Sequence, residues 1–252
     1  MKEEIKIEKK EEEKEEFLHL LDSSYPLLRR FRDTCPGTYK HSQAVSAMVE
    51  SVSVILGLDV TFMKTVAMYH DVGKINNPKF FTENQLEKDD DPHYSLDTWI
   101  SSQIISRHVA DSVNILLNNK QFPNRMLEII SQHHGTSVIK YFYDRSENGK
   151  EEDYRYKCTK PDSIEAAVLM VCDRLEAMTR SLFQNNKYNR DPSEIVNDLI
   201  NYLLEDEQLD DVTIKLGDLK LFKNVLNKEL EGMYSKRIDY DKADREKNEK
   251  EI

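Results

Sequence analysis

Glycine, proline and cysteine are all scarce in this chain of 252 residues, which contains seven, seven and three of them respectively. So few glycines exclude a collagen-like or glycine-rich repetitive protein. The cysteines, Cys35, Cys158 and Cys172, have no paired spacing, so we expect free thiols of the cytosol rather than a disulfide framework.

Long apolar runs and an excess of positive charge are also missing. No window approaches 18 consecutive apolar residues, and the N-terminus has no apolar segment typical of a secretory signal. We therefore expect a soluble, cytoplasmic chain with no membrane-spanning part. Lys and Arg number 36 against 47 Asp and Glu, a formal net charge of −11. Because proteins that bind long nucleic acids carry a basic surface, we expect no such partner.

The two ends differ in composition from the rest of the chain. Residues 1–16 contain five Lys and eight Glu, and residues 236–252 contain six basic and six acidic side chains. Such segments cannot bury enough apolar surface to offset the entropy of ordering. We predict a charged leader over 1–16, disordered or a frayed helix, and a charged C-terminal tail over 241–252. Residues 17–240 are long enough for one hydrophobic core.

The sequence between these ends has helical apolar periodicity almost throughout, with glycine and proline between the periodic stretches. Strand-like alternation occurs only briefly, at 212–214. The fold class expected is therefore all-α, with a polar loop over 76–92. The first predicted helix covers 17–31, with an interruption at Pro26, and the second runs from an N-cap at Thr38 to residue 56. The remaining predicted helices cover 60–69, 95–118, 123–134, 136–147, 162–185, 193–205 and 217–235.

Histidine and aspartate are arranged unusually along these helices. His70 is followed directly by Asp71, and His133 by His134. A single histidine is more often packed or exposed than a ligand, but here several apolar helical segments each carry one. Asp173 ends the apolar run 166–172, where a carboxylate is costly to bury unless it is paired or bound to metal. The pattern therefore indicates metal coordination.

Imidazole and carboxylate together suit first-row divalent ions such as Fe, Mn, Zn, Co or Ni. A carboxylate can bridge two ions, and two ions about 3.5–4 Å apart can share a water and acidify it until it is hydroxide near neutral pH. That hydroxide can attack a phosphorus in line. Neighbouring helical residues point about 100° apart, so one of His133 and His134 binds metal and the other binds metal or contacts the phosphate.

The order His41, His70-Asp71 and Asp173 resembles the HD-domain metal-dependent phosphohydrolases. The segments YHDVGKINNPKFFTENQ, ISRHVADSV and HHGTSVIKYFY narrow the resemblance to the cytosolic HD domain of the PgpH-type seven-transmembrane HD proteins, which hydrolyse cyclic di-AMP. It extends over about residues 17–240. It implies a single HD-domain helical bundle with a dinuclear site for two divalent transition-metal ions, Mn or Fe.

The resemblance also implies a set of site residues. Asp71 is the carboxylate shared by both ions and, with Lys74 and His134, belongs to the catalytic group. The metal ligands implied are His41, His70, Asp71 and Asp173 for one ion, Asp71, His108 and His133 for the other, and His134 as the second histidine of the doublet. The substrate-binding residues implied are Lys74 and Arg180 for phosphate or base, and Thr38 and Thr136, which serve equally well as helix N-caps.

The predicted function is therefore a phosphodiesterase that opens cyclic di-AMP to linear pApA, with further cleavage to AMP left open. Its relatives carry seven membrane helices before this domain, so the chain is either a free-standing enzyme or an excised cytosolic domain; the N-terminal Met without a tag-like run favours the first. Whether it is a monomer or a homodimer stays open.

Three alternatives remain beside this prediction. Hydrolases of cyclic di-GMP have a Gly-Tyr-Pro segment that this sequence lacks, and deoxynucleotide triphosphohydrolases use the HD core with one metal and fewer histidines. A cyclic-dinucleotide sensor without activity would normally have lost ligands. Outside the ligand set, we expect packing for His19 and Trp99, solvent exposure for His93, and a buried inert thiol at Cys172.

Overall fold

The computed structural model describes residues 17–85, 91–184 and 190–248, and over these ranges the chain is all-α, as predicted. The predicted leader 1–16 and the last residues of the predicted tail lie outside the described residues. Within them, the only pairing of β type is an isolated bridge between Val138 and Arg155. The helices are α2 (Pro26–Thr34), α3 (Pro36–Leu56), α4 (Val60–Tyr69), α5 (Thr98–Leu117), α6 (Asn124–Gln132), α7 (Lys140–Tyr143), α8 (Ile164–Gln184), α9 (Pro192–Glu205) and α10 (Leu216–Asn248).

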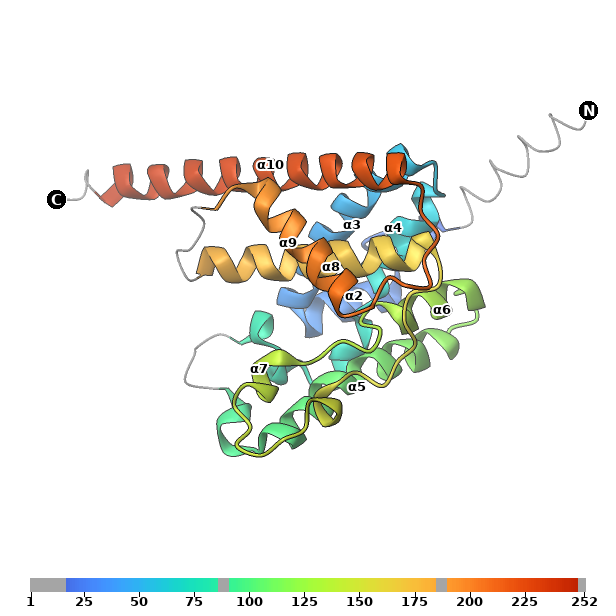
Figure 1. Ribbon diagram of the computed structural model, residues 1–252, viewed down its shortest axis with the longest axis vertical. Helices are drawn as coiled ribbons and strands as arrows, with labels where there is room; N and C mark the ends of the chain where they lie inside the picture. The colour runs from blue at the N-terminus through green and yellow to red at the C-terminus, as the bar shows by residue number, and fades with distance from the viewer. Residues whose placement is uncertain (1–16, 86–90, 185–189, 249–252) are drawn as a thin grey trace, which may run out of the picture.

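The helix α8 runs through the middle of the molecule, with α10 along one side and α5, α6 and α7 on the other (Figure 1). Helix α3 packs against α4, α8 and α10. The contacts are made by wholly buried aliphatic side chains at helical spacing, such as Val45, Val49 and Val52 on α3 and Val168 and Leu175 on α8. No helix of the described ranges is both long enough and apolar enough to cross a bilayer.

Several helix ends follow from local sequence. Gly57, at φ +70°, ends α3 in the left-handed conformation that glycine adopts without strain. The carboxylates of Asp59, Asp97 and Asp191 then accept a backbone N–H at the start of α4, α5 and α9 respectively.

The structure corrects three of the predicted helices. Helix α3 begins at Pro36, so Thr38 is inside its first turn and is not the N-cap. The predicted helix 136–147 is only the single turn α7, because the backbone N–H groups of Ile139 and Tyr156 pair with the carbonyls of Tyr154 and Ser137. Helix α10 continues to Asn248, well past the predicted end at 235 and into the predicted tail. The predicted loop 76–92 contains short 3-10 turns in its described part.

The turn after α4 places the HD dipeptide directly against α5. Helix α4 ends at Tyr69 with His70 as its C-cap, and a 3-10 turn over Val72–Asn76 follows. Gly73 donates its backbone N–H to Ser112 Oγ (2.8 Å), and a Cβ at Gly73 would overlap the carbonyl oxygen of His108. Only glycine permits this approach, which brings the dipeptide beside the histidine of α5.

Candidate metal centre

The seven predicted ligands come from five helical segments and meet in the interior. His41 is on α3, His70 and Asp71 follow α4, His108 is on α5, His133 and His134 follow α6, and Asp173 is on α8. They form two groups that could each hold a metal ion, and within each group the ligand atoms lie within 4.8 Å of one another. The first group is His41, His70, Asp71 and Asp173, and the second group is His108, His133 and His134.

Asp71 faces both groups with a different oxygen toward each. Its Oδ2 lies 3.6 Å from Nε2 of His41 and 3.4 Å from Nε2 of His70, both in the first group. Its Oδ1 lies 3.1 Å from Nε2 of His108 and 3.8 Å from Nε2 of His133, both in the second group. This is the arrangement a carboxylate needs to bridge two ions.

Three of the histidines are oriented by the same local hydrogen bond. Nδ1 of His70, His108 and His133 bonds the carbonyl oxygen three residues earlier, at 2.7, 2.6 and 2.6 Å. A carbonyl oxygen only accepts, so each Nδ1 carries a hydrogen and each Nε2 is directed toward the centre, where it can bind a metal ion or a proton. Metal-binding histidines are commonly held in this way by a second hydrogen bond.

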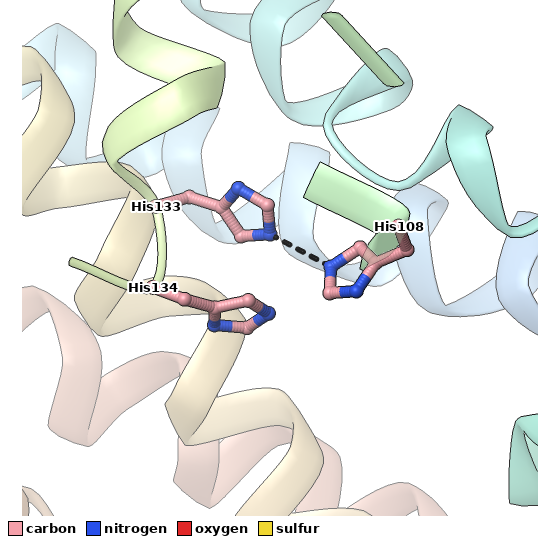
Figure 2. Close-up of side chains that lie close together, drawn as sticks. All are labelled: His108, His133 and His134. Carbon is pink, nitrogen blue, oxygen red and sulfur yellow. Dashed lines mark hydrogen bonds between the residues drawn. The ribbon is translucent and has the colours of Figure 1, made fainter. Parts of the chain in front are cut away.

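In the second group, two of these Nε2 atoms face each other. Figure 2 shows His108 and His133 pointing toward each other, with His134 beside them. Their Nε2 atoms are 3.3 Å apart. In neutral rings fixed by Nδ1, both of these atoms are acceptors, so the contact is favourable only with a cation between them.

Two further buried atoms point to the same conclusion. Nε2 of His70 and Oδ1 of Asp71 have no hydrogen-bond partner among the described residues, although both side chains are nearly inaccessible. Unsatisfied buried polar atoms are costly. The donor set of imidazole and carboxylate, the facing lone pairs and these two atoms all fit divalent metal ions.

His41 is held differently, by a carboxylate that the sequence analysis missed. Its Nε2 lies 2.9 Å from Oδ1 of Asp173, and its Nδ1 makes a short hydrogen bond to Oε2 of Glu176. Glu176 is one turn after Asp173 on α8 and is 6% exposed. A carboxylate behind a ligand histidine orients the ring and raises its basicity. The i, i+3 spacing from Asp173 was the sequence signal available for it.

The two groups differ in protonation. Burial alone would lower the pKa of His70, but the carboxylates of Asp71 and Asp173 outweigh it and raise that pKa to about 10. In the second group, burial and the neighbouring imidazoles lower the pKa of His133 to about 3. Burial and His133 likewise hold the pKa of His134 well below its usual range. The first group therefore attracts positive charge, while His133 and His134 of the second group stay neutral.

The two basic side chains predicted to contact the substrate, Lys74 and Arg180, lie near the predicted ligands and are paired with carboxylates. Lys74 Nζ lies 2.7 Å from Oδ2 of Asp71 and donates to Oε1 of Glu83 (2.8 Å). Arg180, one turn after Glu176 on α8, lies 3.4 Å from Oε2 of Glu176 and 3.9 Å from Oε2 of Glu83. The Asp71 and Glu83 carboxylates outweigh the effect of burial and raise the pKa of Lys74, so it stays a cation.

The predicted threonines occupy different positions. Thr38 is fully buried, and its hydroxyl donates to Oε1 of Glu83 at 2.9 Å. The backbone N–H of Thr136 donates to Oε1 of the fully buried Gln208 at 2.9 Å, so Thr136 is held by the loop after α9. The ring of Tyr156 stacks on His134 with centroids 4.4 Å apart. Neither Gln208 nor Tyr156 had a sequence signal, because both come from irregular segments.

The residues outside the ligand set have mixed outcomes. Cys172 is buried, and desolvation raises its thiol pKa, as expected for an inert thiol. His93 was expected to be exposed but is half-buried, with Nε2 2.9 Å from the carbonyl oxygen of Phe80. The packing expected for His19 and Trp99 is wrong, because both side chains are exposed.

A helical bundle that gathers histidines and aspartates around an HD dipeptide at a helix end is characteristic of one class of proteins. The chain belongs to the HD-domain family, whose profile, described as "HD domain", matches residues 38–178. The fold and the ligand pattern agree with that assignment.

The chain is homologous to proteins named cyclic-di-AMP phosphodiesterase PgpH. It is 35% identical to that of Bacillus subtilis (strain 168) over 230 residues, or 90% of this chain and 32% of the relative. It is 33% identical to that of Listeria monocytogenes serotype 1/2a (strain 10403S) over 227 residues, or 88% of this chain and 31% of the relative. The chain thus spans about a third of the length of these relatives.

Solved structures agree with this homology. The crystal structure of the L. monocytogenes phosphodiesterase PgpH HD domain superposes with a TM-score of 0.75 at 33% identity, covering 84% of this chain and all of that one. The same domain in complex with cyclic-di-AMP gives a TM-score of 0.74 at 32% identity, with 83% and 97% covered.

Proposed function

We propose that this protein is a metal-dependent phosphodiesterase that hydrolyses cyclic di-AMP to linear pApA. The observation that carries the proposal is the position of Asp71, whose two oxygens face two separate groups of ligand atoms. The similarity to PgpH, including its HD domain in complex with cyclic-di-AMP, supports the choice of substrate.

The first group would hold one ion and the second group the other, with Asp71 shared between them. Mn and Fe are the ions proposed, because mixed imidazole and carboxylate donors suit them. When bound, two such ions supply Lewis acidity and acidify a water for attack on phosphorus. The chain's own part is to hold these donors in fixed orientations, which the carbonyl-bonded Nδ1 atoms and Glu176 accomplish.

The basic side chains beside the ligands would bind the substrate. Lys74, 12% exposed, lies 2.7 Å from Asp71, so its ammonium would be placed to bind an oxygen of a phosphate at the metal centre. Arg180, 27% exposed, presents a planar guanidinium that fits a second phosphate. Together with two bound divalent ions, these cations would outweigh the nearby carboxylates, and a small dianion senses nearby charges more strongly than the acidic character of the whole chain.

The test is turnover of four nucleotides. The purified protein is incubated with Mn²⁺ and cyclic di-AMP, cyclic di-GMP, cyclic GMP-AMP or dGTP, and the products are separated by chromatography. We expect cyclic di-AMP to be cleaved fastest, giving pApA. Exclusive cleavage of dGTP would refute the proposal. Binding of cyclic di-AMP without cleavage of any compound, by protein that holds metal, would identify a sensor instead.

Lys74→Ala separates substrate binding from metal binding in the same assay. We expect the rate to fall about 10- to 100-fold, as for loss of a charged contact to the reacting group, with metal content unchanged. Metal content is measured by inductively coupled plasma mass spectrometry. Loss of metal in this variant would assign Lys74 to the metal centre rather than to the substrate.

A further inference from the structure

A buried carboxylate outside both ligand groups lies between the two cations of the site. Glu83 has a side chain 8% exposed, and its Oε1 accepts hydrogen bonds from Lys74 Nζ (2.8 Å) and from the Thr38 hydroxyl (2.9 Å). Its Oε2 faces Arg180 Nη1 at 3.9 Å. Burial opposes ionisation, but the Lys74 ammonium outweighs it and lowers the pKa of Glu83 to about 2. The group is therefore an anion that faces both cations.

The backbone around Glu83 is fixed on the first turn of α3. The side-chain oxygen of Asn84 accepts the N–H groups of Gly37 (3.0 Å) and Thr38 (3.1 Å), which have no partner within the helix. The Asn84 amide also donates to the Thr38 hydroxyl at 2.8 Å. A Cβ at Gly37 would overlap the carbonyl oxygen of Glu83, so the close approach requires glycine. Glu83 thus has a defined position relative to α3.

A buried anion beside a site for an anionic substrate repels the substrate and is costly to bury unless cations are paired with it. Lys74 has two carboxylate partners, Asp71 and Glu83. In the proposed metal-loaded centre the oxygens of Asp71 face the two ions, which leaves Glu83 as the principal acceptor for the ammonium. A lysine side chain is flexible, so a fixed acceptor restricts it to one orientation before the substrate arrives.

We propose that Glu83 is a positioning residue that holds Lys74, and through its second oxygen Arg180, in the orientation in which they receive the substrate phosphate. This inference rests on the proposed phosphodiesterase function. It explains why the short segment 82–84 is fastened to α3 by side-chain and backbone hydrogen bonds, although none of its residues is a metal ligand.

The test compares Glu83→Gln with Glu50→Gln. Glu50 forms a surface ion pair with Lys64 (2.7 Å) on the α3–α4 face, so its variant removes the same type of pair away from the site. We expect Glu83→Gln to lower kcat/KM for cyclic di-AMP about 10- to 100-fold, as for a misoriented catalytic group, with metal content unchanged. Glu50→Gln should stay within about twofold of the wild-type rate.

A double-mutant cycle with Lys74→Ala distinguishes positioning from a general structural effect. Lys74 makes the shorter contact with Glu83 (2.8 Å against 3.9 Å for Arg180), so we expect most of the effect to pass through it, and Glu83→Gln should have less than about a threefold further effect in the Lys74→Ala background. Additive losses, a wild-type rate in Glu83→Gln, or loss of metal from that variant would each overturn the inference.

Failure of the proposed function would be distinguishable. If wild-type protein does not cleave cyclic di-AMP, that function is refuted, and the same cycle is measured with bis(p-nitrophenyl) phosphate. If neither is cleaved, the cycle is measured as the dissociation constant of inorganic phosphate for the metal-loaded protein. Coupling between Glu83 and Lys74 in either measurement supports positioning, and additivity overturns it.

Discussion

Asp71 faces both ligand groups of the proposed centre, but the two groups differ in charge and in how their side chains are held. The first group contains two carboxylates, and Glu176 lies behind His41. The second group is made of histidines alone, two of them fixed by backbone carbonyls. His70 of the first group therefore binds a proton readily in the metal-free protein, whereas His133 and His134 of the second group do not. The two neighbouring groups should thus bind metal with different affinity and different pH dependence.

Removing the shared ligand should have the largest effect, since it eliminates the link between the groups. We expect Asp71→Ala to lower hydrolysis of cyclic di-AMP at least about 1,000-fold, equivalent to several kcal/mol of transition-state stabilisation. Turnover and bound metal are measured on the same sample. A rate near that of the wild type would refute the two-metal centre.

Removing one ligand from each group tests the difference in affinity. His133→Ala leaves the first group intact, so we expect it to retain about one tightly bound ion per chain. Asp173→Asn removes an anion from the first group, and we expect the affinity of its tightest site to fall at least about 100-fold. Metal competition with a chelator measures both. Equal losses in the two variants would show that the groups do not differ.

The pH dependence gives a third comparison. His70, with its pKa raised to about 10, is protonated in the metal-free protein at pH 6–8, so binding at the first group must displace a proton. Affinity should therefore rise with pH, by about 100-fold from pH 6 to pH 8 for one proton. His133, with its pKa lowered to about 3, is neutral over this range and should release none. Calorimetry in buffers of different ionisation enthalpy measures the protons released. Absence of release would contradict the assignment.

The smallest expected effect comes from the carboxylate behind His41. Glu176→Gln keeps the shape of the side chain but removes its charge, and we expect metal affinity at the first group to fall about 10-fold with the second unaffected. Glu229→Gln, which alters a carboxylate bonded to the Ser51 hydroxyl on the α3–α10 face, is the matched control. A loss at the second group would mean that Glu176 supports the whole centre.

The all-α fold could be predicted because helical periodicity is a local property of the sequence, whereas the seven residues that converge were identified by the resemblance to the HD-domain phosphohydrolases. Glu83 and Tyr156 could not be predicted, since each acquires its partner only when an irregular segment meets a helix distant in sequence. The start of α3 was placed wrongly for the same reason: the groups that cap it come from Asn84, 46 residues after Thr38. Glu176 could have been predicted from the sequence, because it lies one turn after Asp173 on the same predicted helix.

The contact at Gly73 has a consequence for the spacing of the two groups. Its backbone lies against the backbone of α5 at His108 and Ser112, and its N–H bonds the Ser112 hydroxyl. The separation of the HD dipeptide from the α5 histidine is therefore set by main-chain thickness. Substitutions in the apolar core do not change this separation, whereas any residue larger than glycine at position 73 would increase the distance between the HD dipeptide and His108, and with it the distance between the two groups. A series of substitutions at Gly73 would thus measure how far two metals can separate before the bridge by Asp71 fails.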